Sequence, residues 1–107
     1  MLVELNENIM FKALSEPFRL RIMVLLTPGE LCVCDLTEVL KLPQSTISRH
    51  ISRLKAISAI NSHRKGKWVF FSLSDNNDEF IKQIFHILKS LQSKEPFQSD
   101  IQKLKVQ

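Results

Sequence analysis

The stretch from Pro43 to Ile57, PQSTISRHISRLKAI, limits most strongly what this chain can fold into. Ile47, Ile51 and Leu54 recur at positions i, i+4 and i+7, so the stretch predicts a helix with one apolar face. Its opposite face is dense in hydroxyl, amide and guanidinium groups. Such groups hydrogen-bond base edges and phosphates, so the helix suits the major groove of DNA. The alternative is an ordinary surface helix whose basic face is only solvated.

The positive charge of the chain gathers around this helix. The chain has 107 residues and a formal net charge of +4, yet residues 39–74 hold seven lysines and arginines and no acidic residue. Clustered cations bind polyanions because they release the condensed counterions. The pattern favours a nucleic acid as the partner. A membrane surface fits poorly, because a core this small needs the apolar residues of the same block.

Helices are expected on the N-terminal side of this stretch. Residues 5–14 carry apolar side chains at helical spacing and predict a first helix. Ser15 is expected to cap a second helix, which has Pro17 in its first turn and runs to about Leu26. A short third helix is expected at about residues 33–40. Because only a short turn separates the third helix from the basic one, the two together predict a helix-turn-helix.

Residues 61–73 predict a β-hairpin, because the segment WVFFSL is rich in aromatic and β-branched residues. Gly66 is available for the positive φ that a hairpin tip requires. Three cations lie at or beside this tip: Arg64, Lys65 and Lys67. We expect the hairpin to be a wing that touches the DNA backbone. The alternative is a solvated tip whose charges only maintain solubility.

Residues 77–93 predict a helix that is apolar on more than one face, which is more than a small domain can bury. We therefore expect a homodimer through the first and last helices, which would present two recognition helices to two half-sites. The chain then divides into a DNA-binding and dimerisation domain at residues 1–95 and a polar C-terminal tail at 96–107. For the tail, a short helix and disorder are both open.

Composition restricts the class of protein further. The chain is 44% hydrophobic and 24% charged, as globular domains are. No apolar run reaches the roughly 18 residues of a membrane span, and Glu4 and Glu7 argue against a secretory signal, so the expected compartment is the cytoplasm. The chain has two glycines, no phosphate-binding glycine loop and no serine–histidine–aspartate set at a supporting spacing. An enzyme is therefore not expected.

The succession of these elements resembles the ArsR/SmtB family of metal-sensing repressors. The segments that carry the resemblance are SEPFRLRIMVLL (15–26), ELCVCDL (30–36), QSTISRHISRLK (44–55) and RKGKWVFFSL (64–73), within about residues 9–92. The resemblance implies a mainly α fold with a β-hairpin wing, in a homodimeric winged helix-turn-helix repressor that sits on operator DNA. By position, it assigns DNA contacts to Gln44, Ser45, Thr46, Ser48, Arg49, His50, Arg53, Arg64, Lys65 and Lys67.

The chain has two cysteines, Cys32 and Cys34, separated by one residue. This is not the spacing of paired zinc-binding cysteines. Cys32 is expected near the N-cap of the third helix and Cys34 in its first turn, where the helix N-terminus lowers the pKa of a thiol. Residues i and i+2 of an intact helix point about 200° apart. We therefore expect that both sulfurs reach one ion only if the first turn distorts, which would move the DNA-reading helix.

The resemblance places these cysteines at two of the three thiol positions of an arsenic site, and Thr37 stands at the third. It implies a repressor that leaves its operator when arsenite or antimonite binds Cys32 and Cys34. A thiol-redox-responsive or metal-independent winged-helix regulator is the alternative. Two further readings stay open: inert buried cysteines, and a protein-interaction module that does not bind DNA.

Overall fold

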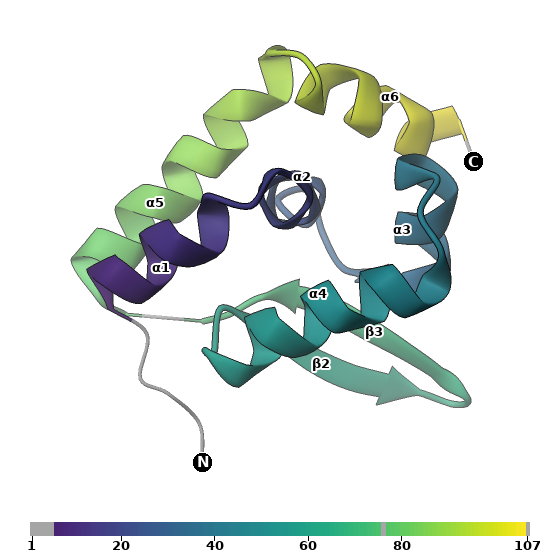
Figure 1. Ribbon diagram of the computed structural model, residues 1–107, viewed down its shortest axis with the longest axis horizontal. Coiled ribbons are helices and arrows are strands. Elements are labelled where there is room, and N and C mark those ends of the chain that lie inside the picture. The colour runs from purple at the N-terminus through teal and green to yellow at the C-terminus, as the bar shows by residue number, and fades with distance from the viewer. Residues whose placement is uncertain (1–5, 76, 107) are drawn as a thin grey trace.

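The computed structural model describes residues 6–75 and 77–106, which form helices around a small sheet (Figure 1). The helices are α1 (Glu7–Leu14), α2 (Pro17–Leu25), α3 (Val33–Leu40), α4 (Gln44–Ala56), α5 (Glu79–Ser90) and α6 (Phe97–Val106). A short 3-10 helix, η1 (Leu91–Ser93), lies between α5 and α6. The strands are β1 (Leu31–Cys32), β2 (Ile60–Lys65) and β3 (Trp68–Leu73).

Helix α2 is the centre of the core. Its four successive residues from Ile22 to Leu25 are all buried. Four successive residues point to all sides of a helix, so this end of α2 needs neighbours all around it. Figure 1 shows α2 nearly end-on, with α5 and α6 arching over it and α3 and α4 on the other flanks. Leu36 of α3, Leu54 of α4 and Leu88 of α5 are buried in this same core.

The start of α2 differs from the sequence prediction. Ser15 continues the helical backbone of α1 and ends that helix, whereas Glu16 is extended, with φ −87° and ψ 122°. An extended conformation is what a following proline favours, and Pro17 follows here. The Glu16 carboxylate accepts a hydrogen bond from the backbone N–H of Arg19 at 2.7 Å. The expectation that Ser15 caps α2 is therefore wrong, and Glu16 is the cap.

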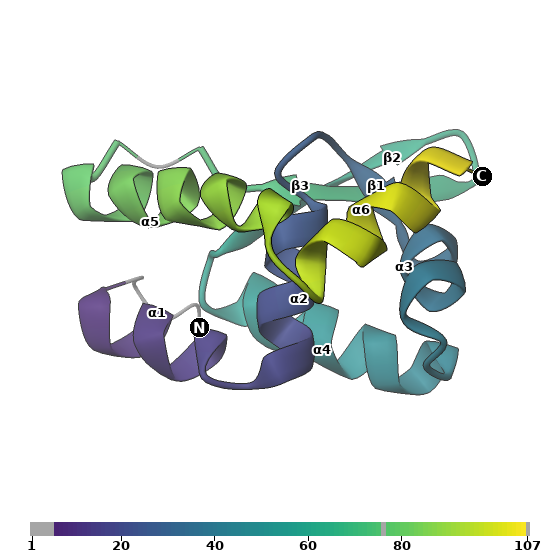
Figure 2. The same cartoon turned by 90° about the horizontal axis from the view of Figure 1, so that it is seen from above.

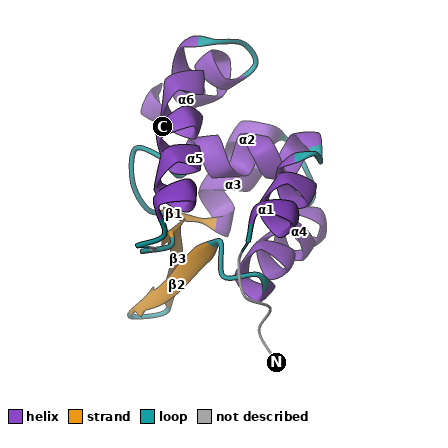
Figure 3. Cartoon of the chain, turned by 90° about the vertical axis from the view of Figure 1, so that its left-hand side faces the viewer, coloured by secondary structure: helices purple, strands orange, loops and turns teal. Residues whose placement is uncertain are grey.

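The predicted helix-turn-helix and hairpin are confirmed. Helix α3 ends at Lys41, whose φ of 56° is left-handed, and α4 begins at Gln44. Strands β2 and β3 pair antiparallel, from Ile60 opposite Leu73 to Lys65 opposite Trp68. Gly66 at the tip has the expected positive φ of 61°. Figure 3 shows the hairpin projecting from the helical body, as a wing does.

A third strand, β1, was not expected from the sequence. It consists of Leu31 and Cys32, which pair antiparallel with Phe71 and Phe70 of β3, so the strand order is β1-β3-β2. Two residues are too few for a periodic pattern to reveal a strand. The pairing joins the segment before α3 directly to the wing.

The segment that was expected as a polar tail is instead helix α6, which packs on α2 and α3 (Figure 2). Phe97 and Ile101 are buried, and Asp100 is only 1% exposed. Both carboxylate oxygens of Asp100 accept hydrogen bonds from the Arg21 guanidinium of α2, each at 2.8 Å. This two-bond pairing offsets the cost of burying the carboxylate. Of the two alternatives left open for residues 96–107, the helix is the one observed, and it shares the core of the rest.

Candidate DNA-binding surface and thiol site

Helix α4 has the amphipathic character that its sequence predicts. Ile47, Ile51 and Leu54 are buried against the core. On the other side, the polar residues that were predicted to contact DNA are exposed or half-buried; Gln44, Ser45, Arg49 and Arg53 are exposed, and Thr46 and Ser48 are half-buried. The guanidinium of Arg49 lies 3.4 Å from the Thr46 hydroxyl. The exposed face therefore combines amide and hydroxyl groups, which are able to hydrogen-bond base edges, with cations, which are able to bind phosphate.

His50 lies apart from this exposed face. Its side chain is 16% exposed, and its Nε2 lies 3.8 Å from the Glu16 carboxylate at the start of α2. Nδ1 of His50 is buried and has no hydrogen-bond partner within the described part of the chain. Burial lowers the pKa of His50 and outweighs the opposite effect of Glu16. The nearby cations Arg19, Arg49 and Arg53 lower this pKa further. The imidazole is therefore neutral near pH 7, and its Nε2 faces Glu16 at the start of α2.

The wing presents its cations in two different settings. Arg64 and Lys67 are exposed near the tip, and the Lys67 ammonium lies 5.7 Å from the centre of the Trp68 ring. Lys65 instead binds the carboxylate of Glu30, which also accepts from His63 Nε2 at 2.6 Å. The hydrogen bond from Lys65 lowers the pKa of Glu30. Glu30 directly precedes β1, so it adds a side-chain link to the backbone pairing between β1 and the wing.

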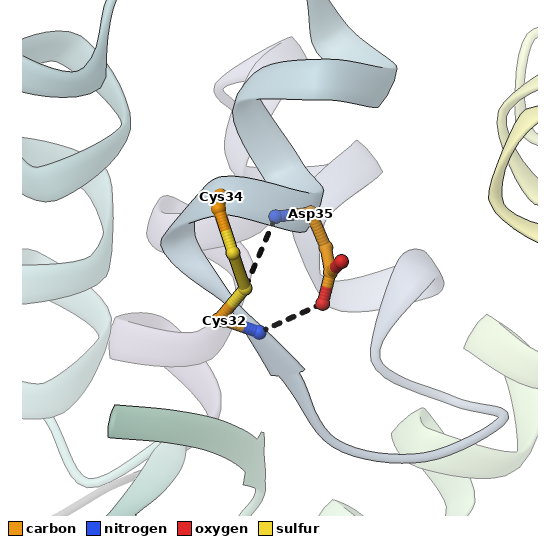
Figure 4. A group of neighbouring side chains, drawn as sticks. All are labelled: Cys32, Cys34 and Asp35. Atoms are coloured by element: carbon orange, nitrogen blue, oxygen red, sulfur yellow. Dashed lines mark hydrogen bonds between the residues drawn. A yellow bond between two sulfur atoms is a disulfide. The ribbon is translucent and has the colours of Figure 1, made fainter. Parts of the chain in front are cut away.

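The two cysteines occupy the junction between β1 and α3 (Figure 4). Cys32 is the last residue of β1 and also the N-cap of α3. Its sulfur accepts the backbone N–H of Asp35 at 3.3 Å, and the Asp35 carboxylate accepts the N–H of Cys32 at 3.1 Å. This reciprocal pair is a capping box with a cysteine in place of the usual serine or threonine. Cys32 and Cys34 are joined by a disulfide.

This arrangement overturns the expected geometry of the thiols. The two sulfurs meet while the first turn of α3 and its capping box are intact. The reason is that Cys32 has an extended backbone, with φ −90° and ψ 169°, so the helical i, i+2 separation does not apply to it. The Cα atoms are 5.2 Å apart. Distortion of α3 is therefore not required for both sulfurs to reach one ligand.

Few side chains at this site are able to bind a metal or metalloid ion. The sulfurs and a carboxylate oxygen of Asp35 lie within 4.8 Å of one another. That carboxylate is engaged by the Cys32 N–H, and the Thr37 hydroxyl donates to the Cys34 carbonyl at 2.9 Å. When reduced, the chain therefore offers two thiolates, which suit a soft ion. A pocket of about 360 Å³ opens beside them.

Sequence reasoning missed the role of Glu30 and the capping box. The capping box had a signal, because Cys32 and Asp35 show the spacing of an N-cap and an acidic residue three positions later. Glu30 had none, since its partners His63 and Lys65 are more than thirty residues away in the sequence.

These features define a class of protein: a winged helix-turn-helix with a basic reading helix, of the kind that binds DNA. None of the helices in the described part of the chain has the length and apolar character needed to span a bilayer. The model of the family described as "bacterial regulatory protein, arsR family" matches residues 16–57. The chain also matches an uncharacterised HTH-type transcriptional regulator of Methanocaldococcus jannaschii, at 37% identity over 82 residues, which are 76% of this chain and 89% of that protein.

A third similarity is to the arsenic resistance transcriptional regulator ArsR1 of Pseudomonas putida, at 43% identity over 70 residues. The match covers 64% of this chain and spans 55% of the length of that relative. Among solved structures, reduced HlyU from Vibrio cholerae N16961 aligns with a TM-score of 0.70 and 29% identity, over 81% of this chain and 88% of that one. The chain belongs to the arsR family of bacterial regulatory proteins, which are DNA-binding transcriptional regulators and not enzymes.

Proposed function

We propose that this chain is a homodimeric repressor that leaves operator DNA when arsenite or antimonite binds the reduced thiols of Cys32 and Cys34. The single observation that carries the proposal is the position of Cys32. It caps α3, which supports α4, and it pairs with Phe70 of the wing. A ligand held there acts on both parts of the DNA-binding surface at once.

The DNA-binding mode follows from the exposed groups. Helix α4 enters the major groove, where Gln44, Ser45, Thr46 and Ser48 read base edges and Arg49 and Arg53 bind guanine or phosphate. Arg64 and Lys67 of the wing bind the backbone, and Lys65 does so when it exchanges the Glu30 carboxylate for a phosphate. His50 serves by holding α4 against α2, because it faces Glu16. We place this regulator in the cytoplasm, where its operator DNA would be.

The dimer interface is proposed on α1 and α5. Phe11 of α1 packs edge-on against Phe80 of α5, with ring centres 5.5 Å apart. Phe11 is nevertheless 55% exposed, and Ile87 on α5 is 52% exposed. Large apolar side chains exposed on two adjacent helices are typical of an interface. A symmetric pair of chains through this face presents two α4 helices to two half-sites.

A second candidate function is favoured by the disulfide between Cys32 and Cys34. In this reading the regulator responds to oxidation, and an oxidant of the peroxide or disulfide class takes two electrons and two protons from the thiols. In the disulfide form the N–H of Asp35 donates to the Cys32 sulfur, so the oxidised pair lies directly at the N-terminal cap of α3. Both candidate functions use the same DNA-binding surface. They differ in whether the thiols react with an arsenical or with an oxidant.

The test is fluorescence anisotropy of the full chain on DNA from its own promoter, first reduced and then titrated with arsenite. We expect wild type to bind and then release the DNA, and Cys32→Ser to bind without release. The double variant Arg49→Ala, Arg53→Ala should lose binding from the start. Release by peroxide with no effect of arsenite would favour the oxidation candidate, and normal binding by the double arginine variant would refute the DNA-binding mode.

A further inference from the structure

The pocket beside the two cysteines is larger than an arsenite ion requires. Its volume is about 360 Å³, and residues of the wing strand β3 form part of its lining. Besides the cysteines, the residues that line it are Val33, Thr37, Gln44, Trp68, Val69 and Phe71. Trp68 is 53% exposed, which is unusual for so large an apolar side chain. The proposed function gives neither the pocket nor the exposed indole a role.

The thiols leave one bond of a trivalent arsenic atom without a protein ligand. Trivalent arsenic forms three bonds, and Cys32 and Cys34 supply two. The Thr37 hydroxyl is engaged with the Cys34 carbonyl, and the Asp35 carboxylate with the Cys32 N–H. Within the described part of the chain, the cluster holds no further thiol, carboxylate or imidazole. The third substituent of the arsenic must therefore arrive with the ligand.

An apolar organic group suits this third position. The residues that flank the sulfurs supply aliphatic and aromatic surface, from Val33, Val69, Trp68 and Phe71. A dry apolar cavity of roughly 150 Å³ is enough to hold benzene, so the pocket at about 360 Å³ has room for a phenyl ring. We propose that the site selects trivalent organoarsenicals, R–As(OH)₂ with an apolar R, over inorganic arsenite. The proposal rests on the proposed function, because it uses the same two thiols.

The binding reaction is a ligand exchange that balances without an oxidant. The Cys32 and Cys34 thiols each replace one hydroxide on arsenic and give up one proton to it. One R–As(OH)₂ and two thiols thus give one R–As(S–Cys)₂ and two waters, and the As–C bond remains. The thiols must first be reduced, and a phosphine reductant does this without competing for arsenic as a dithiol would.

The test compares phenylarsine oxide with sodium arsenite on the full, reduced chain by isothermal titration calorimetry. A phenyl group changes arsenic–thiol affinity by itself, so the quantity of interest is the Kd ratio of the two ligands, compared between variants. We expect Trp68→Ala to lower the preference for the phenyl compound roughly tenfold, as lost burial of part of a ring implies. Asn61→Ala, an exposed change on β2 outside the pocket, is the matched control and should leave the ratio unchanged.

Two further measurements make the outcome specific. Trp68 is the single tryptophan of the chain, so its fluorescence should change more with phenylarsine oxide than with arsenite. Thr37→Cys supplies the missing thiol. We expect it to raise the affinity for arsenite at least tenfold and so to reduce the preference for the phenyl compound over arsenite. An equal Kd ratio in wild type and Trp68→Ala, or no effect of Thr37→Cys on arsenite, would overturn the inference.

The same samples on operator DNA separate the two proposals. If both arsenicals bind and neither releases DNA, the repressor mechanism fails while the ligand preference stands. The opposite result is that arsenite releases DNA, and that arsenite and the phenyl compound bind with equal affinity in wild type and in Trp68→Ala. In that case the repressor mechanism stands and the organoarsenical inference fails.

Discussion

Ser58 adopts a backbone conformation that suits glycine better than serine. It lies just after α4 with φ 63°, and its N–H donates to the Lys55 carbonyl at 2.9 Å. A left-handed residue at this position is a common way to end a helix. For a residue with a Cβ the conformation costs about 1–2 kcal/mol, which glycine largely avoids.

We expect Ser58→Gly to raise the free energy of unfolding by about 0.5–1.5 kcal/mol, after the greater backbone entropy of unfolded glycine is subtracted. Urea unfolding followed by circular dichroism measures this. Ser58→Ala is the matched control, because it removes the hydroxyl and keeps the Cβ. Equal stability of the glycine and alanine variants would mean that strain at φ 63° is not the cause.

His50 makes stability depend on pH in a definite direction. Burial lowers its pKa in the folded protein below the ordinary value of 6.5. As the pH falls past 6.5, the unfolded chain takes up the proton before the folded protein does. The stability that neutral His50 contributes is therefore complete above pH 6.5 and is lost as the pH falls toward the pKa of the folded state. We expect wild type to lose more stability than His50→Gln between about pH 7 and pH 5.5. Parallel pH profiles of the two proteins in urea unfolding would contradict this.

Helix α6 depends on one buried pairing. The Asp100 carboxylate is almost fully buried, and its hydrogen bonds raise the pKa of Arg21. We expect Asp100→Ala to lower the free energy of unfolding by about 1–3 kcal/mol, because the half-buried guanidinium loses both acceptors. Gln98→Ala, an exposed change on the same helix, should stay within about 0.5 kcal/mol of wild type. Thermal unfolding measures both, and similar losses in the two variants would disprove the role of the pairing.

At the level of elements, the sequence predicts helices and strands that have a periodic apolar pattern. It does not predict very short strands or contacts between residues far apart in the chain. The periodic apolar residues of α4 locate it to within a residue, and Gly66 locates the wing tip. Helix α6 is hard to predict from the sequence because one of its buried residues, Asp100, is charged. Its partner Arg21 lies seventy-nine positions away. The cysteines could be placed at the start of α3. That their sulfurs meet could not be predicted, since it depends on the extended backbone of Cys32.

The assembly of the whole molecule can be tested on α5. Ile87 is exposed in the single chain, so Ile87→Lys should leave the fold intact. If α1 and α5 form the dimer, the added charge should give a monomer in sedimentation velocity and reduce affinity for a two-site operator by at least about tenfold, through lost bivalency. Lys89→Gln changes the charge by one unit on the opposite side of α5 and serves as the control. A dimer of Ile87→Lys with unchanged operator affinity would place the interface elsewhere.

Thr37 shows how such a regulator can change over evolutionary time. The residue is half-buried, and its hydroxyl donates to the Cys34 carbonyl of its own helix. It lies outside the buried core and lines the same pocket as Gln44, the first residue of α4. A substitution there alters the chemistry that an incoming ligand encounters and leaves every side chain of α4 and the wing as it is. The range of inducers can therefore change by single substitutions among descendants of one ancestral regulator, while the residues that face the operator are retained.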